Sequence, residues 1–412
     1  MTSLSPDVAT RIERDQLGEL PLPMAALYGI HTARAVANLG FSGRTLGGYP
    51  IYLGALMLVK RAAARANREA GVLDERRARA IDDACDTLRR GAQLDHFPVD
   101  LLGGGGGIAV NMNVNEVLAN LANEALGSAR GSYDPVHPKT HVNASQSTAD
   151  VCHSAARLAL LEHWEALQSP LQDCVAALAA KAAELQPVTT RARTCLQDAL
   201  PVSLGAHFSG YVALLERRTS ELFRSVLALR RINLGGTVIG SGDGASPAYR
   251  ARVVAVLAEV AGRELWRRDN LYDAAQNLDD LGAVSAQLAQ LAEALMKIAQ
   301  DLRLLSSGPD AGFGELTLPA VQEGSSFFAA KINPVVPETL LQCGFQVLAC
   351  DRAVRLAVER GELNLNVFEG AAVANLFDAF AMLTRAVPLF TERCVKGIAA
   401  NRQRCRALAE LG

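Results

Sequence analysis

The sequence of 412 residues has few aromatic residues (5%) and almost no net charge, with a formal value of −2. Because 41 Lys and Arg nearly cancel 43 Asp and Glu, the chain offers no general field for nucleic acid or for an anionic membrane. Half of the residues are apolar, and Ala and Leu dominate among them. Both lose little entropy in a helix, so we expect an all-α protein. The balanced charge predicts no nucleic-acid and no membrane partner.

Patterns that would indicate a metal site or a disulfide framework are also missing. The seven histidines show no HxH or HExxH spacing, and the eight cysteines form no CxxC pair. Most cysteines lie in apolar helical stretches such as QDCVAALAA, which is typical of buried free thiols in a reducing compartment. We therefore expect no metal and no cofactor.

Long uncharged apolar runs are absent too. Charges at Arg11, Glu13, Arg14 and Asp15 interrupt any signal-peptide core, and no run of about 18 uncharged apolar residues follows. The sequence thus predicts neither a leader nor a membrane span. It predicts a cytoplasmic location.

The chain does contain long stretches with a period near 3.6, which predict helices. These helices are expected at 150–185, 208–232, 277–305, 337–360 and 368–390. Much of 277–305 is apolar all round, which is typical of a helix inside a bundle. Strand signals are weak. We expect a helical N-terminal domain over 1–140, a central helical bundle over 141–390 and a short C-terminal segment over 391–412.

Gly-rich and polar loops join these helices, and three of them contain candidate chemistry. The glycines at 103–107 lack the GK[ST] ending of a P-loop, so we interpret them as a flexible connection, which the helix start NMNVNEVLAN follows. HVNASQSTAD, before the helix at 150–185, holds more hydroxyls and amides than capping requires, and such an excess at a helix N-terminus suits a carboxylate. GSSFFAAKINP combines paired serines with a lysine and an asparagine, which suits holding an anion while a proton is removed.

Several segments, in order, resemble the aspartase/fumarase superfamily, and aspartate ammonia-lyases in particular. They span nearly the whole chain, as follows: ERDQLGELPLPMAALYGIHTARAVANL, NMNVNEVLAN, HVNASQSTAD, RTCLQDALP, AAQNLDDLGAVSAQL, GSSFFAAKINPVVPE, ELNLNVFEGAAVANL and FTERCVKGIAANRQRCRAL. The resemblance implies a mainly helical subunit with a long central bundle. It also implies a homotetramer in which three subunits share each active site.

The resemblance further implies a reaction on a small dicarboxylate. A base removes the proton next to one carboxylate of a succinate-type or aspartate-type substrate, and the aci-carboxylate then expels the neighbouring group to give a fumarate-like alkene. Ser325 matches the base, which must act as a stabilised oxyanion. The positions that match substrate-binding groups are Ser147, Thr148, Ser326, Lys331, Asn333 and Asn143.

Three positions depart from the family pattern on the side of the leaving group. Ile108 replaces a threonine, Ala149 an asparagine and Cys195 a histidine, so the pocket loses polar groups that would bind ammonium. The family's Met-Pro after the serines is Phe328-Ala329 here. The C-terminal segment also matches only a remnant of the family's last domain, which helps to close the catalytic loop.

Three functions are therefore open. The first is an aspartase-like lyase with a non-standard leaving group, acting by anti elimination or by the reverse addition, of the kind used in specialised metabolism. The second is a non-catalytic scaffold or regulatory homologue. The third is an atypical aspartate ammonia-lyase or fumarase.

Overall fold

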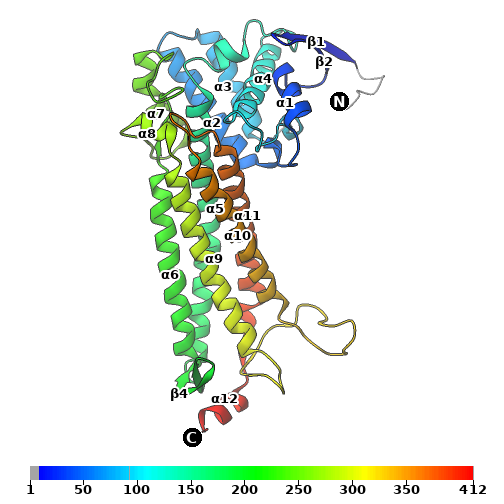
Figure 1. Cartoon of the computed structure of the whole chain (residues 1–412), viewed down its shortest axis with the longest axis vertical. Coiled ribbons are helices and arrows are strands. Elements are labelled where there is room, and N and C mark those ends of the chain that lie inside the picture. Colours follow the sequence, from blue (N-terminus) through cyan, green and yellow to red (C-terminus); the bar gives the residue numbers. More distant parts are fainter. Residues whose placement is uncertain (1–8, 92, 412) are drawn as a thin grey trace. The chain divides into compact units, whose positions relative to one another are not determined.

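The computed structural model describes residues 9–91 and 93–411, which divide into two compact units. Unit 1 comprises the described residues up to Glu162 together with Leu227–Gly282 and Ala353–Phe377. Unit 2 comprises His163–Val226, Ala283–Arg352 and the described residues from Asp378. Several long helices begin in one unit and end in the other, and each unit is described by itself below (Figure 1).

Unit 1 is built on helices that pack around α2, an apolar helix that Pro50 opens. Its helices and short helical turns are α1 (Ile30–Leu39), η1 (Leu46–Gly48), α2 (Pro50–Glu69), α3 (Glu75–Arg89), η2 (Leu94–His96), α4 (Ile108–Ala125), the π-helical turn η3 (Pro138–Val142), α7 (Pro247–Ala261) and α8 (Leu271–Gln276). Helices α3 and α7 make the most extensive contacts with α2.

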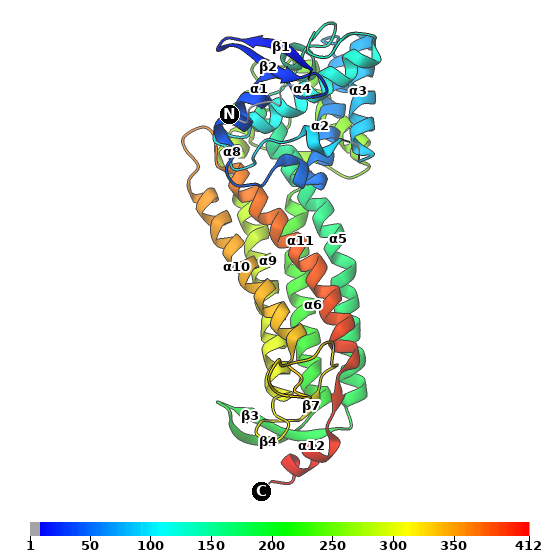
Figure 2. The same ribbon diagram turned by 90° about the vertical axis from the view of Figure 1, so that its right-hand side faces the viewer.

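In unit 2, parts of five long helices run side by side (Figures 1 and 2). These are α5 (Thr148–Leu185), α6 (Leu204–Ala228), α9 (Asp279–Leu305), α10 (Val335–Glu359) and α11 (Glu369–Arg393), and the segment ends with η4 (Val395–Gly397) and α12 (Arg402–Ala409). Trp164 of α5 stacks on Phe223 of α6, with ring centroids 5.8 Å apart. The Ser285 hydroxyl of α9 donates to Asp351 of α10 at 2.7 Å. The helices therefore form one packed bundle within the unit.

The core face of α9 shows why this segment becomes a bundle helix. Leu288, Leu291, Leu295, Ile298 and Leu302 recur at spacings of three and four residues, and each is at most 1% exposed. The residues on the opposite face, such as Lys297, are exposed in the single chain. The expectation of an apolar surface all round this helix was therefore too broad, whereas its place inside a bundle is confirmed.

The strands of the described residues form four two-stranded sheets. The pairs are β1 (Thr10–Asp15) with β2 (Gly18–Pro23), β3 (Thr189–Thr194) with β4 (Gln197–Ser203), β5 (Arg231–Ile232) with β6 (Trp266–Arg267), and β7 (Leu316–Thr317) with β8 (Ala399–Ala400). All pairs are antiparallel except the short β5–β6 pair. The all-α prediction is confirmed as a mainly helical fold, but the helix expected over 208–232 ends at 228, and Arg231–Ile232 form β5.

Buried free cysteines agree with the expectation of unpaired thiols. All eight are free, and only Cys195 is exposed. One helical stretch of the described residues, 369–397, is long and apolar enough to cross a membrane by length and composition. Half of its most apolar window is buried inside the protein, as in a core helix. The domain limits at 140 and 390 stay a prediction.

Candidate functional site

The start of α5 in unit 1 holds the first group of predicted site residues. Ser147 lies immediately before the helix, its Oγ accepts the Ala149 N–H at 3.3 Å, and its own N–H donates to Asp150 Oδ1 at 2.9 Å. This reciprocal pattern is a capping box. The second oxygen of Asp150 accepts the N–H groups of Gly235 and Thr237 at 3.0 and 3.1 Å, and burial raises the pKa of Asp150 to about 6. Asp150 thus fixes the helix start against the Gly-rich loop that follows β5.

Asn143 and Thr148 are brought together by a buried network of amides. Asn143 Oδ1 accepts from Asn111 Nδ2 at 3.0 Å and from Asn115 Nδ2 at 3.2 Å. Asn111 Nδ2 also donates to Thr148 Oγ1 at 3.1 Å. The Lys60 ammonium completes the network, because Nζ lies 3.0 Å from Asn143 Oδ1. Two predicted site residues of one loop, Asn143 and Thr148, therefore share one polar cluster with side chains of α2 and α4.

Lys60 was not among the residues that the sequence predicted. It is completely buried, although lysine is almost never buried without a partner. A signal was present, since Lys60 stands three and four residues after Met57 and Leu56, on the apolar face of a helix. Glu116, which the sequence placed at a helix start, instead accepts the N–H groups of Gly29, His31 and Thr32 and so fixes the N-terminus of α1.

Two of the three altered positions lie beside this cluster. Ala149 is 3% exposed, so no polar side chain enters the site from the second residue of α5. Ile108 opens α4 and is 37% exposed. The preceding Gly107 has φ +82°, and a Cβ there would lie 3.5 Å from the Thr148 methyl and 3.2 Å from Cys152 Sγ. The glycines therefore let the backbone before Ile108 approach the start of α5 closely.

Ser325 lies in unit 2, in the loop of residues 318–334 that joins β7 to α10. Its Oγ accepts two backbone N–H groups, from Phe327 at 3.0 Å and from Phe328 at 2.8 Å. Hydrogen bonds to the charged form of a group lower its pKa. The loop thus supplies two donors to the oxygen that would have to carry a negative charge.

The base of this loop is closed by backbone contacts. Gly324 N–H donates to the Lys331 carbonyl at 2.9 Å, and Asn333 Nδ2 donates to the Gly324 carbonyl. A Cβ on Gly324 would lie 2.2 Å from the Lys331 carbonyl oxygen, so only glycine fits there. Asn333 therefore closes the loop in this structure, whereas the resemblance assigned it to substrate.

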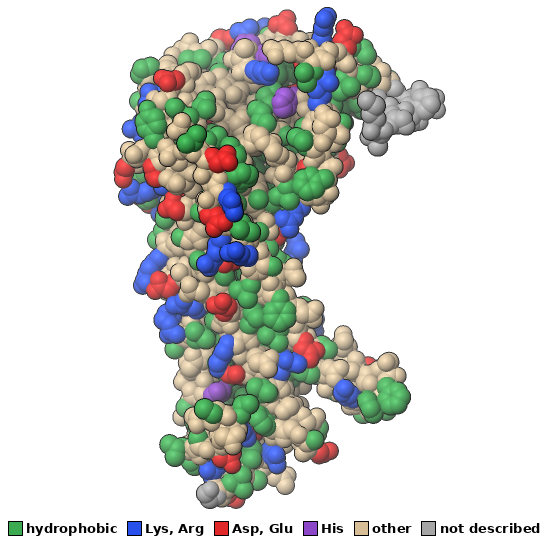
Figure 3. Space-filling model, in the orientation of Figure 1, with side chains coloured by type: hydrophobic (Ala, Val, Ile, Leu, Met, Phe, Trp, Pro, Cys, Tyr) green, Lys and Arg blue, Asp and Glu red, His purple; other side chains and the backbone are tan. Residues whose placement is uncertain are grey.

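Exposed apolar side chains surround the serine. Phe327 and Phe328 are 84% and 58% exposed and contact each other edge to face, with ring centroids 4.8 Å apart. Lys331 Nζ lies 5.8 Å from the Phe328 ring, and Ser326 is exposed. In Figure 1 this loop stands away from the bundle helices of unit 2, and Figure 3 shows apolar side chains on it.

Cys195 occupies the turn of the β3–β4 hairpin in unit 2. Cys195 and Leu196 have φ of +53° and +58°, and both are exposed. Positive φ at both central positions is the pattern of a tight hairpin turn that usually takes Asn or Gly. Cys195 therefore lies in unit 2, whereas Ile108 and Ala149 lie in unit 1.

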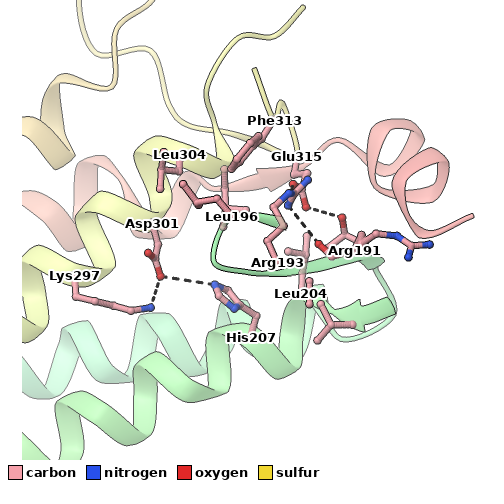
Figure 4. Close-up of a pocket in the computed structure, with 14 residues that line it drawn as sticks. Arg191, Arg193, Leu196, Leu204, His207, Lys297, Asp301, Leu304, Phe313 and Glu315 are labelled. Carbon is pink, nitrogen blue, oxygen red and sulfur yellow. Dashed lines mark hydrogen bonds and ion pairs between the residues drawn. The ribbon is translucent and has the colours of Figure 1, made fainter. Parts of the chain in front are cut away.

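A cavity of about 320 Å³ lies beside this hairpin, between β3, β4, the start of α6 and the end of α9 (Figure 4). Glu315 is completely buried on its wall and accepts from Thr190 Oγ1 at 2.5 Å and Arg193 Nη1 at 2.6 Å. Asp301 pairs with Lys297. Because Arg193 and Lys297 both have carboxylate partners, we assign no dicarboxylate-binding role to this cavity.

Comparisons with known proteins identify the family. A lyase family model matches residues 18–349. Aspartate ammonia-lyase of Pseudomonas fluorescens is 44% identical over 410 residues, which cover 99% of this chain and 85% of that protein. The solved structure of a fumarate lyase:delta crystallin from Brucella melitensis bound to cobalt has a TM-score of 0.96 and 44% identity, over 98% of this chain and 88% of that one.

A more distant structure extends the comparison to fumarases. Recombinant class II fumarase from Schistosoma mansoni has a TM-score of 0.93 at 30% identity, over 97% of this chain and 87% of that one. In the part of the chain that the structure describes, no group of three His, Cys, Asp or Glu side chains is placed to hold a metal ion. The chain belongs to the lyase family, within the aspartase/fumarase superfamily, and is similar to aspartate ammonia-lyases over nearly its whole length.

Proposed function

We propose that the chain is an aspartase-like lyase that acts on a succinate-type or aspartate-type dicarboxylate with Ser325 as the base. One observation carries this proposal: Ser325 Oγ accepts two backbone N–H groups of its own loop, at 3.0 and 2.8 Å. A serine can act as a base only as an oxyanion, and fixed donors are what stabilise an oxyanion.

The reaction proceeds by anti elimination or by the reverse addition. The Ser325 oxyanion takes the proton from the carbon next to one carboxylate, and the electron pair of that C–H bond moves into the carboxylate. The pair then returns to form the alkene while the bond to the leaving group breaks, and the leaving group departs with its electrons. Thr148, Ser147 and Ser326 hydrogen-bond the carboxylate that carries the developing charge. Lys331, Asn333 and Asn143 hold or position the rest of the dicarboxylate.

We further propose that the leaving group is not ammonia. The buried Ala149 and the apolar Ile108 supply no hydrogen bonds to an ammonium, which would cost a few kcal/mol. A nitrogen substituent or a larger, less polar group suits these side chains better. The proposal includes a homotetramer in the cytoplasm whose active sites each take residues from three subunits, as the resemblance to the superfamily implies.

The test is an assay of fumarate absorbance in both directions, with a panel of amines, hydroxylamine, hydrazine and nitrite. We expect turnover with one of these partners, and a loss of about 10²–10⁴-fold in kcat for Ser325→Ala. Ser209→Ala, at an exposed serine of α6, is the control and should keep full activity.

Other outcomes would contradict the proposal. Efficient turnover of aspartate or malate would refute the altered leaving group. Absence of any turnover, with succinate binding unchanged by Ser325→Ala and Lys331→Ala, would support the non-catalytic scaffold instead. Recovery of aspartase activity in the double variant Cys195→His with Ala149→Asn would directly support the account of the pocket.

A further inference from the structure

Lys60 is a buried lysine whose amino group has no carboxylate partner among the described residues. Its Nζ donates to two amide oxygens, Asn143 Oδ1 and Gln146 Oε1, each at 3.0 Å. Among the described residues no acidic side chain forms an ion pair with it, and burial lowers its pKa to about 7. Removing an ammonium from water without a counter-ion is costly, so a buried lysine of this kind requires a compensating role.

The charged and titratable groups around Lys60 do not supply this counter-ion by contact. Asp150 and Cys152 approach it from α5, and Cys85 approaches it from α3. Burial raises the pKa of both thiols, so they are neutral near pH 7. The Asp150 carboxylate is already occupied by three backbone N–H groups. The Lys60 amino group therefore acts mainly on the two amides that it contacts.

The hydrogen bonds lead from Lys60 to the hydroxyl of Thr148. Asn143 Oδ1 accepts from Lys60 and from Asn111 Nδ2, and the same Asn111 nitrogen donates to Thr148 Oγ1 at 3.1 Å. An amide group has two hydrogens, so Asn111 can serve both acceptors. Because Thr148 Oγ1 accepts, its own hydrogen must point elsewhere, and no described residue accepts that hydrogen. Thr148 is partly exposed, so the hydrogen is available to a ligand.

We propose that Lys60 is a positioning residue for the substrate: it fixes Asn143 and Gln146 and, through Asn111, turns the Thr148 hydroxyl into a donor to the substrate carboxylate. This inference rests on the proposed function. If Lys60 had only a structural role, the same contacts would stabilise the fold. Removing Lys60 would then not change what the Thr148 hydroxyl contributes to the reaction.

The test is a double-mutant cycle on kcat and KM. Thr148→Val should lower kcat by roughly 100-fold, and Lys60→Met by roughly 30-fold, with smaller changes in KM because the charge grows in the transition state. If Lys60 acts through Thr148, the double variant should lose little more than Thr148→Val alone. Multiplied losses of roughly 3,000-fold, or a change in KM alone, would overturn the inference.

A matched control and a second cycle protect this test from trivial failure. Lys181→Met removes another buried lysine, which bonds to Glu184 and the Ile398 carbonyl in unit 2, and should leave kcat and KM unchanged. If circular dichroism shows that Lys60→Met does not fold, Asn111→Ala combined with Thr148→Val tests the step from Asn111 to Thr148, on which the role of Lys60 depends. Multiplied losses in that cycle would likewise overturn the inference.

Binding of succinate by titration calorimetry separates this inference from the proposed function. We expect both single variants to weaken succinate binding, and the double variant to weaken it little further. Turnover by the unmodified protein together with independent effects of the two changes would refute only the role of Lys60. Neither turnover nor succinate binding by the unmodified protein would refute both proposals.

Discussion

Glu369, at the start of α11, is expected to make the stability of the protein fall as the pH rises. The side chain is 3% exposed, and its Oε2 lies 3.6 Å from His153 Nε2. Its Oε1 has no hydrogen-bond partner among the described residues. Burial raises the pKa of Glu369 to about 8 and lowers the pKa of His153 to about 4. Both groups are therefore neutral near pH 6, with the carboxyl protonated.

The direction of the effect follows from linkage between protonation and folding. The unfolded chain releases the Glu369 proton near pH 4.5, whereas the folded chain keeps it to about pH 8. The stabilisation relative to the ionised state is thus fully present below about pH 4.5 and is lost as the pH rises through about 8. At 1.36 kcal/mol for each pKa unit, the whole difference is about 5 kcal/mol.

Glu369→Gln removes this proton equilibrium and keeps the shape of the side chain. Urea unfolding at pH 5, 6.5 and 8.5, at one protein concentration, gives the free energy of unfolding of both proteins. The free energy of unfolding of the variant, relative to that of the unmodified protein, should rise with pH by on the order of 4 kcal/mol across this range. Glu362→Gln, at an exposed position of the same unit, should show no such trend. A difference between Glu369→Gln and the unmodified protein that is independent of pH would refute the assigned protonation state.

Two further predictions concern packing in each unit. In unit 1, Asp280 accepts two hydrogen bonds from the buried Arg157, at 2.7 and 2.8 Å. Asp280→Ala should therefore lower the free energy of unfolding, measured by urea titration, by about 3–5 kcal/mol. A loss below about 1 kcal/mol would show that water reaches the guanidinium. In unit 2, a Cβ on Gly205 would lie 2.3 Å from the Ala182 carbonyl oxygen, whereas a Cβ on Gly210 of the same helix meets nothing within 4 Å. Gly205→Ala should therefore lower the thermal midpoint, and Gly210→Ala should raise the free energy of unfolding by about 0.5–1 kcal/mol; similar effects of the two changes would contradict this contrast.

The long helices were the most predictable part of the fold. Over 150–185 and 277–305 the apolar period persists for many turns, and α5 and α9 begin and end within two residues of the predicted bounds. Tertiary packing stabilises helices of this length, so α5 continues through Pro170. The sheets were less predictable, because each consists of two short strands. The turn of the β3–β4 hairpin contains Cys195 and Leu196 instead of Asn or Gly, so the usual sequence signal was missing.

The candidate site was predictable only where one loop contains the chemistry. Ser325 and its two backbone donors lie within four residues of each other, in the one loop whose resemblance to the superfamily singled out this serine. The network of Lys60, Asn111 and Thr148 joins α2, α4 and the start of α5, which are far apart in the sequence. No local pattern could reveal that a lysine on an apolar face meets the amides of Asn143 and Gln146, in a distant segment.

The network also bears on the proposal that the leaving group differs while the substrate carboxylate is still bound. Thr148 and Ala149 are neighbours in the first turn of α5, but they depend on different partners. The hydroxyl of Thr148 is held through Asn111 by groups on α4 and α2, whereas the Ala149 side chain has no polar atom and takes no part in these hydrogen bonds. An exchange of asparagine for alanine at 149, which the resemblance implies, would therefore remove one polar group and leave the hydrogen bonds from Asn111 to Asn143 and Thr148 in place. The reverse change would bury an amide in need of partners, which is why we pair Ala149→Asn with Cys195→His.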